Sequence, residues 1–169
     1  VIGNPHPKIY GGFNTKISYD RFSLDLGFDF AGGHDVLNLD RMMQENVSGT
    51  GNITRSAYDR AKFVSGKQLP SYAGFGANGL DLISDRYVEK GDYVRLANIT
   101  LSYDVPVERI KWMRTMSVYF NVYNALVFTS YDGWNPEVNS FGVDNLRSGI
   151  AYGAHPDTRR FTLGIPTTF

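Results

Sequence analysis

The sequence predicts an all-β fold in which antiparallel strands form a segment of a transmembrane β-barrel, and three observations carry this prediction. Apolar and polar residues alternate over five stretches, each about as long as a tilted strand needs to cross a bilayer. The connections between these stretches alternate between short and long along the chain. The composition holds 11 Tyr, 11 Phe and 18 Gly, which favours strands and turns.

The last predicted strand, residues 159–169, shows the alternation clearly. One face carries Phe161, Leu163, Ile165, Thr167 and Phe169, and the other carries Thr162, Gly164, Pro166 and Thr168. Successive side chains of a strand point to opposite sides, so one surface is apolar and the other is small and polar. A strand that ends on an aromatic residue of its apolar face is typical of outer-membrane barrels.

Four earlier stretches have the same character and predict strands at about 8–19, 21–30, 93–105 and 116–128. The second has the cleanest period, with Phe22, Leu24, Leu26, Phe28 and Phe30 alternating with small or polar residues. The third places Ala97, Ile99, Leu101 and Tyr103 on its apolar face. In water such a face would line a core, and in a bilayer it would meet lipid; the pattern alone does not distinguish the two.

The connection lengths predict a topology. Outer-membrane barrels have short turns on the periplasmic side and long loops outside, so we expect residues 31–92 and 129–158 to be extracellular. Residues 1–169 as a whole then form one part of a barrel. Within the first loop, the spacing of apolar residues predicts short helices at 36–47 and 55–64.

Composition excludes several classes of protein. The formal net charge of +0 argues against nucleic acid as a partner, because no basic excess is present to neutralise phosphates. No run approaches the ~20 apolar residues of a spanning helix, so any membrane crossing must use strands. The first residues lack the pattern of a secretory signal, so a chain that reaches the outer membrane is expected to be part of a longer polypeptide.

Catalytic and metal-binding patterns are weak. Residues 74–79 match G-x-G-x-x-G, but no predicted strand precedes them and no predicted helix follows, so chance among the glycines is the better account. His6, His34 and His155 lie far apart in the sequence and lack the spacing of metal ligands. We therefore predict no enzyme activity, no cofactor and no bound metal. A calcium site from Asp132, Asn135, Glu137 and Asp144 matches by ligand type but not by spacing.

The sequence also resembles the SusC-type TonB-dependent transporters of Bacteroidetes outer membranes, over nearly the whole chain. The resemblance rests on short strings in residues 2–13, 91–106, 121–138 and 152–164. They include Gly91-Asp92-Tyr93-Val94-Arg95-Leu96 and Tyr131-Asp132-Gly133-Trp134-Asn135-Pro136-Glu137.

This resemblance implies a 22-stranded barrel of which the chain is the C-terminal part, containing about five strands. It implies a bacterial outer-membrane location and the import of glycans or peptides together with a SusD-like surface lipoprotein. Coupling to the TonB complex would use an N-terminal part that the chain lacks. The barrel-assembly machinery and outer-membrane lipid are further implied partners, with the terminal strand and Phe169 as the signal for assembly.

Two groups of residues are candidates for contact with substrate, and the first is also a candidate for contact with the lipoprotein. In the second long loop they are Tyr131, Asp132, Trp134, Asn135 and Glu137, a mixture that stacks on sugar rings and bonds hydroxyls. On the polar strand face, expected to line the lumen, they are Asp25, Asp29, Tyr119, Asn121 and Tyr123. For both groups, packing against loops, lid or plug is the simpler interpretation. The alternative function is a soluble, secreted, β-rich carbohydrate-binding module whose apolar faces form a core.

Overall fold

The computed structural model describes residues 2–45, 52, 54–55, 85–108, 110, 112–142 and 147–169. The chain divides into two compact units. The first comprises residues 1–7, 33–91 and 131–156, and the second comprises residues 8–32, 92–130 and 157–169. The long strands lie in the second unit, which we call the sheet unit, and the first is called the loop unit.

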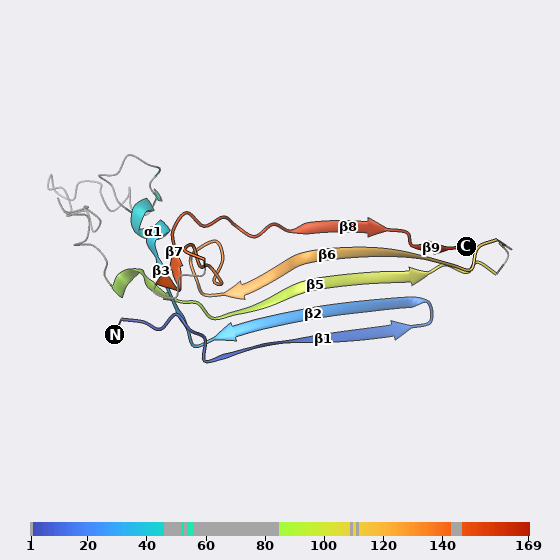
Figure 1. Cartoon of the computed structure of the whole chain (residues 1–169), viewed down its shortest axis with the longest axis horizontal. Coiled ribbons are helices and arrows are strands. Elements are labelled where there is room, and N and C mark those ends of the chain that lie inside the picture. Colours follow the sequence, from blue (N-terminus) through green and yellow to red (C-terminus); the bar gives the residue numbers. More distant parts are fainter. Residues whose placement is uncertain are drawn as a thin grey trace. The chain divides into compact units, whose positions relative to one another are not determined.

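The sheet unit is an antiparallel sheet in the order β1-β2-β5-β6-β8, with β9 paired to β6 (Figure 1). Its strands are β1 (Ile9–Tyr19), β2 (Phe22–Gly32), β5 (Tyr93–Asp104), β6 (Thr115–Thr129), β8 (Arg160–Gly164) and β9 (Thr167–Thr168). The predicted all-β antiparallel fold is confirmed. The predicted last strand, however, is divided at Ile165 and Pro166, because proline has no N–H to donate to the ladder.

Hydrogen-bond register aligns the apolar residues of neighbouring strands. Leu26 pairs with Thr15 on one side and with Ile99 on the other, and Ile99 pairs with Val122. A bulge at Ala97 shifts the register, so that Leu96 and not Ala97 stands opposite Phe28. The prediction that Ala97 lies in the apolar row was wrong for this reason, because a bulge adds one residue to one strand. Val94 and Leu96 take the corresponding positions on the apolar face.

The two ends of the sheet differ in their connections. At one end β1 and β2 are joined by Asp20 and Arg21 alone, with Asp20 at φ +51°. Asp tolerates this left-handed conformation, which two-residue hairpin turns require. At the other end β2 ends, β5 begins and β6 ends together, because Ala31 pairs with Tyr93 and Tyr93 pairs with Thr129. Both long connections therefore leave from the same end of the sheet.

The loop unit contains regular structure that the sequence did not indicate. A small sheet has the order β4-β3-β7, formed by β4 (Val88–Lys90), β3 (Asp35–Asn38) and β7 (Ile150–Ala151). β3 pairs antiparallel with β4 and parallel with β7, so it joins the two long connections. Strands of two to four residues are too short to show alternation, so the sequence pattern does not reveal them.

Helix α1 (Leu39–Gln44) follows β3 directly, and η1 (Asp85–Tyr87) precedes β4. α1 begins later than the predicted 36–47, because Val36 and Leu37 belong to β3 and Asn38 caps the helix through a hydrogen bond from the Arg41 N–H. Residues 56–64 of the second predicted helix lie outside the described residues. No helix in the described part of the chain is long and apolar enough to span a membrane.

The small sheet carries the core of the loop unit. Val36 and Ala151 are each 1% exposed, and Tyr131 packs with them. Val138 covers the same cluster from the second long connection. Burial of these side chains from both connections fixes the position of the segment 131–134 next to α1.

Candidate functional site

The apolar face of the sheet unit remains exposed along its length. Phe13 is 55% exposed, Phe161 is 62% exposed and Leu163 is 69% exposed. Aromatic rings pair across neighbouring strands on this face, with Phe13 and Phe28 stacked at 4.7 Å between ring centroids and Phe120 and Phe161 at 6.3 Å. An exposed aromatic and aliphatic surface of this extent is characteristic of contact with lipid or with another protein.

The opposite face carries the residues predicted to line the lumen. The register places Asp25 next to Thr100, Thr100 next to Asn121, and Asn121 next to Thr162, so that polar side chains form a row across four strands. The Asn121 amide donates to Thr100 Oγ1 at 2.7 Å and to the Asn98 side chain. The row itself contains Asp25 and Asn121. Asp29 lies on the same face because it follows Asp25 by four residues, and Tyr119 and Tyr123 do so because each is two residues from Asn121.

Charged and aromatic side chains lie on the same face as this polar row. Asp29 forms an ion pair with Arg95, and the Arg160 guanidinium lies 5.3 Å from the ring centroid of Tyr123. Gly164 is opposite Tyr119, and a Cβ added to Gly164 would overlap the Tyr119 ring. The absence of a side chain at Gly164 therefore gives Tyr119 its place on the polar face.

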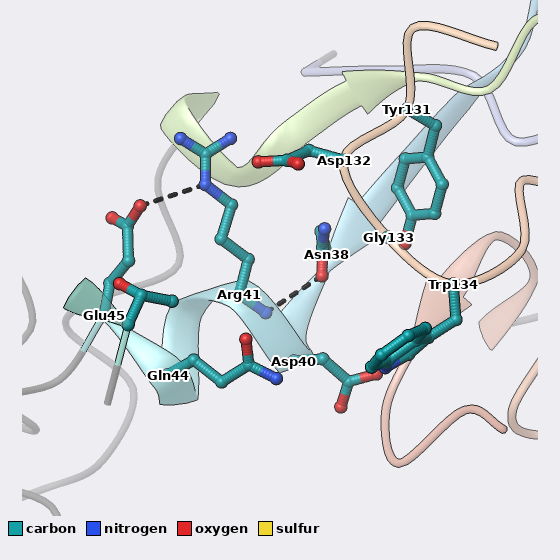
Figure 2. A pocket seen from close by; sticks show the side chains of 10 residues that line it. Asn38, Asp40, Arg41, Gln44, Glu45, Tyr131, Asp132, Gly133 and Trp134 are labelled. Carbon is teal, nitrogen blue, oxygen red and sulfur yellow. Dashed lines mark hydrogen bonds and ion pairs between the residues drawn. The ribbon is translucent and has the colours of Figure 1, made fainter. Parts of the chain in front are cut away.

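The loop unit contains a cavity of about 300 Å³ that is formed by both long connections. The first connection, between β2 and β5, contributes lining residues from β3, from α1 and from the segment after α1. The second connection, between β6 and β8, contributes the segment 131–134 at its start. The lining residues are Asn38, Asp40, Arg41, Gln44, Glu45, Thr54, Tyr131, Asp132, Gly133 and Trp134. Figure 2 shows Trp134 at the same end of this cavity as Asp40, and the Asp132 carboxylate at the end of the Arg41 guanidinium.

A chain of ion pairs includes two lining residues of the cavity, Arg41 and Glu45. Arg41 donates to Glu45 Oε1 at 3.0 Å and to Glu89 Oε1 at 2.7 Å, and Arg86 donates to Glu45 Oε2 at 2.8 Å. Burial alone would raise the pKa of Glu45, but hydrogen bonds from Arg41 and Arg86 outweigh it and hold that pKa below its ordinary value. The pKa of the Arg41 guanidinium is raised, chiefly by its hydrogen bond to Glu89.

Glu89 also fixes the second connection. Its Oε2 atom accepts the Asp132 N–H at 2.9 Å, while its other oxygen accepts from Arg41. The Asp40 carboxylate similarly accepts the N–H groups of Gly153 at 2.6 Å and Ala154 at 3.3 Å. Two carboxylates of the first connection thus bond the backbone of the second.

Tyr131 and Gly133 set the shape of the cavity. Tyr131 is 6% exposed, and its burial, together with the carboxylates of Glu89, Asp40 and Asp132, raises its hydroxyl pKa. A Cβ at Gly133 would overlap the buried Tyr131 ring, so glycine is required for this close approach. Trp134 follows and is 61% exposed, in contrast to Tyr131.

The structure brings together only part of the predicted loop site. Tyr131, Asp132 and Trp134 line the cavity, whereas Asn135 and Glu137 do not. The Asn135 side chain instead accepts the Glu137 N–H at 2.9 Å, which closes a local turn. Sequence reasoning missed the contribution of the first connection, namely Asn38, Asp40, Arg41, Gln44, Glu45 and Glu89. Only the N-cap pattern of Asn38 before α1 was a usable signal.

Other predicted features are placed as follows. Phe169 stacks on Trp112, with ring centroids 5.5 Å apart, and is 68% exposed. No cluster of three or more His, Cys, Asp or Glu side chains suited to a metal ion occurs in the described ranges. Asp144 of the calcium hypothesis and residues 74–79 lie outside those ranges.

Comparison with known proteins identifies relatives along the whole chain. No protein-family model matches it. The chain is 33% identical over 175 residues to TonB-dependent receptor P3 of Formosa agariphila, covering 100% of this chain and 17% of the relative. It is 24% identical to TonB-dependent receptor SusC of Bacteroides thetaiotaomicron, covering 100% of this chain and 16% of that protein. The chain therefore spans a small fraction of the curated relatives it matches.

Solved structures give the same fold. The RagAB peptide importer in its open-open state matches with a TM-score of 0.74 at 24% identity, over 97% of this chain and 17% of the other. The RagAB peptide transporter matches with a TM-score of 0.69 at 22% identity, over 98% of this chain and 17% of the other. The sheet unit is thus the fold of a barrel segment, in which an exposed apolar face and a polar opposite face are expected.

Proposed function

We propose that the chain is a segment of a SusC-type TonB-dependent transporter and that it supplies part of the wall and external loops of an outer-membrane importer of glycans or peptides. The single observation that carries the proposal is the pairing of two different faces on one set of strands. Phe13, Phe120 and Phe161 expose an apolar surface, while Asp29, Arg95 and Asn121 occupy the polar one. In this proposal lipid covers the first face and the transport lumen borders the second.

The proposal assigns partners to the different parts of the chain. The loop unit would be extracellular and would meet substrate and a SusD-like lipoprotein near the cavity. TonB would act through other parts of the same protein. The role of Phe169 in recognition by the barrel-assembly machinery stays a prediction.

The alternative of a soluble carbohydrate-binding module receives less support. Such a module needs its apolar strand faces inside a core. The exposure of Phe13, Phe161 and Leu163, each above one half, favours a lipid-facing surface instead.

Membrane fractionation and surface labelling test the proposal in cells that produce the protein carrying this chain. The chain has no cysteine, so Glu137→Cys in the second connection and Arg21→Cys in the β1–β2 turn introduce single reactive sites into it. We expect outer-membrane recovery and labelling of Glu137→Cys by an impermeant maleimide on intact cells that lack the lipoprotein. Arg21→Cys should be labelled only after permeabilisation, and its labelling on intact cells would contradict the topology.

Uptake decides the transport part of the proposal. Cells with the protein should accumulate a fluorescent oligosaccharide or oligopeptide that cells lacking the gene do not. Equal accumulation of every tested glycan and peptide by both strains would contradict import.

A further inference from the structure

We propose that the cavity beside α1 binds an uncharged sugar ring of the transported ligand, with Trp134 as the stacking surface and Gln44 and Asp132 as hydrogen-bonding groups. The inference rests on the proposed import function and selects among its possible substrates.

The cavity has the size and lining for such a ligand. Its volume of about 300 Å³ is at the lower end of small-molecule sites. Its lining combines two aromatic residues with the amide of Gln44, the carboxylates of Asp40 and Asp132, and the guanidinium of Arg41. A sugar ring presents hydroxyl groups at its edge and C–H groups on its faces, so it requires both hydrogen-bonding groups and an apolar wall.

Trp134 provides the apolar wall. Its side chain lines the cavity and is 61% exposed, whereas the neighbouring Tyr131 is buried in the core of the loop unit. Much of the indole surface is therefore accessible to a ligand. The Glu89 contact to the Asp132 N–H and the close packing of Gly133 on Tyr131 hold the segment that presents this indole, so the surface is formed before a ligand arrives.

The charges of the site favour an uncharged ligand. Among the described residues that line the cavity or pair with its lining, Arg41 and Arg86 are paired with Glu45 and Glu89, and Asp40 and Asp132 add two further carboxylates. The raised pKa of Tyr131 has these same two carboxylates among its causes. A uronate or sulfate group would therefore be repelled.

A cationic ligand is also disfavoured. The Arg41 guanidinium lines the same cavity, and the Asp40 carboxylate already accepts two backbone N–H groups. Hydroxyl groups suit this mixture better, because they donate to carboxylates and accept from a guanidinium.

Saturation-transfer NMR on the purified full-length protein tests the site. The neutral probes are D-glucose, D-galactose, D-mannose and D-xylose; the charged probes are D-glucuronate, D-galacturonate and lysyl-glycine. We expect at least one neutral sugar to bind and the uronates and the dipeptide to bind at least tenfold more weakly. Preferential binding of a uronate or of the dipeptide would overturn the proposal, and so would the absence of binding by every neutral sugar.

Substitutions place the binding in the cavity. Trp134→Ala should lower the affinity for the bound sugar at least tenfold, and Trp134→Phe should restore part of it. Trp112→Phe, which changes the only other tryptophan of this chain and keeps a ring against Phe169, should leave the affinity unchanged. Asp132→Asn should keep the neutral sugar within threefold and strengthen uronate binding. Unchanged affinity in Trp134→Ala would overturn the proposal.

Membrane recovery separates this inference from the function on which it rests. All four variants should reach the outer membrane in the same amount as the parent protein, because Trp134 and Asp132 lie in the loop unit and Trp112→Phe keeps an aromatic ring against Phe169. Loss of sugar binding with full recovery is a property of the site, whereas a parent protein absent from the membrane would contradict the import function itself.

Discussion

Arg95 forms a two-point contact with Asp29 across β2 and β5. Its Nε donates to Oδ1 at 3.1 Å and its Nη2 donates to Oδ2 at 2.6 Å, and the two residues are direct partners in the register. The side chains are only 18% and 27% exposed, and the Asp157 carboxylate lies 3.6 Å from Nη1 of the same guanidinium. The pair is therefore a well-oriented, partly desolvated ion pair on the polar face.

Arg95→Gln should destabilise the sheet unit by about 1–3 kcal/mol, because it leaves Asp29 without its charged partner. Unfolding by urea of the purified protein carrying this chain measures the change. The matched control is Lys16→Gln, whose ion pair with Asp25 is longer at 3.8 Å and has side chains 61% and 37% exposed. Its effect should stay within about 0.5 kcal/mol. Equal effects of the two variants would contradict a special role for Arg95.

Leu26→Arg should reduce the amount of protein assembled in the outer membrane. Leu26 lies in the middle of β2 between Thr15 and Ile99, on the apolar face. A charged residue facing lipid costs about 2–4 kcal/mol at the bilayer midplane. Asp25→Asn, one residue away on the polar face, should leave the yield unchanged. Equal yields from both variants would show that this face does not meet lipid.

The sequence predicted the long strands well because their period is unbroken over ten or more residues and does not depend on distant segments. Phe22 to Phe30, for example, is apolar at every second position and forms β2. The bulge at Ala97 was not predictable in this way. It depends on the register with Gly27 and Phe28 of β2, a relationship between strands some seventy residues apart.

The sequence predicted only those residues of the site that lie in the second long connection. Tyr131, Asp132 and Trp134 stand out by composition, but their neighbours on α1 are brought to them by the pairing of Leu37 with Ile150. This parallel pair spans more than one hundred residues and leaves no local pattern in the sequence. The part of the site that arises from long-range pairing was therefore inaccessible to periodicity and motif analysis.

Acid should loosen the loop unit. The pKa of Glu45 is held below its ordinary value in the folded protein, so its ion pairs add stability above its unfolded pKa, near 4.5, and lose it as the pH falls through the folded pKa. Asp35 acts in the same direction, because the hydrogen bond from Lys90 lowers its pKa. Amide-exchange protection of α1 and β4 should be constant from pH 7 to about pH 5.5 and decrease below about pH 4.5.

Glu45→Gln separates the contribution of this residue to the pH profile. The variant should show lower protection of α1 at pH 7 and a smaller further decrease on acidification, since Asp35 still titrates. The protection of β2 and β5 serves as the internal control in both proteins. A profile identical to that of the parent protein would mean that the pairs of Glu45 with Arg41 and Arg86 do not stabilise the loop unit.

Glu89→Ala should release the segment that carries Trp134. The Glu89 side chain is 11% exposed, and its two oxygens bond Arg41 and the Asp132 N–H, so its removal leaves a partly buried guanidinium and a backbone N–H without this acceptor. We expect a local loss of about 1–3 kcal/mol, seen as faster proteolytic cleavage within residues 129–142 while the unfolding of the sheet unit is unchanged. Asp85→Ala removes an exposed carboxylate from η1 in the same unit and is the matched control. Cleavage of Glu89→Ala at the rate of Asp85→Ala would show that the segment 131–134 is held by its buried Tyr131 alone and not by the bond from Glu89.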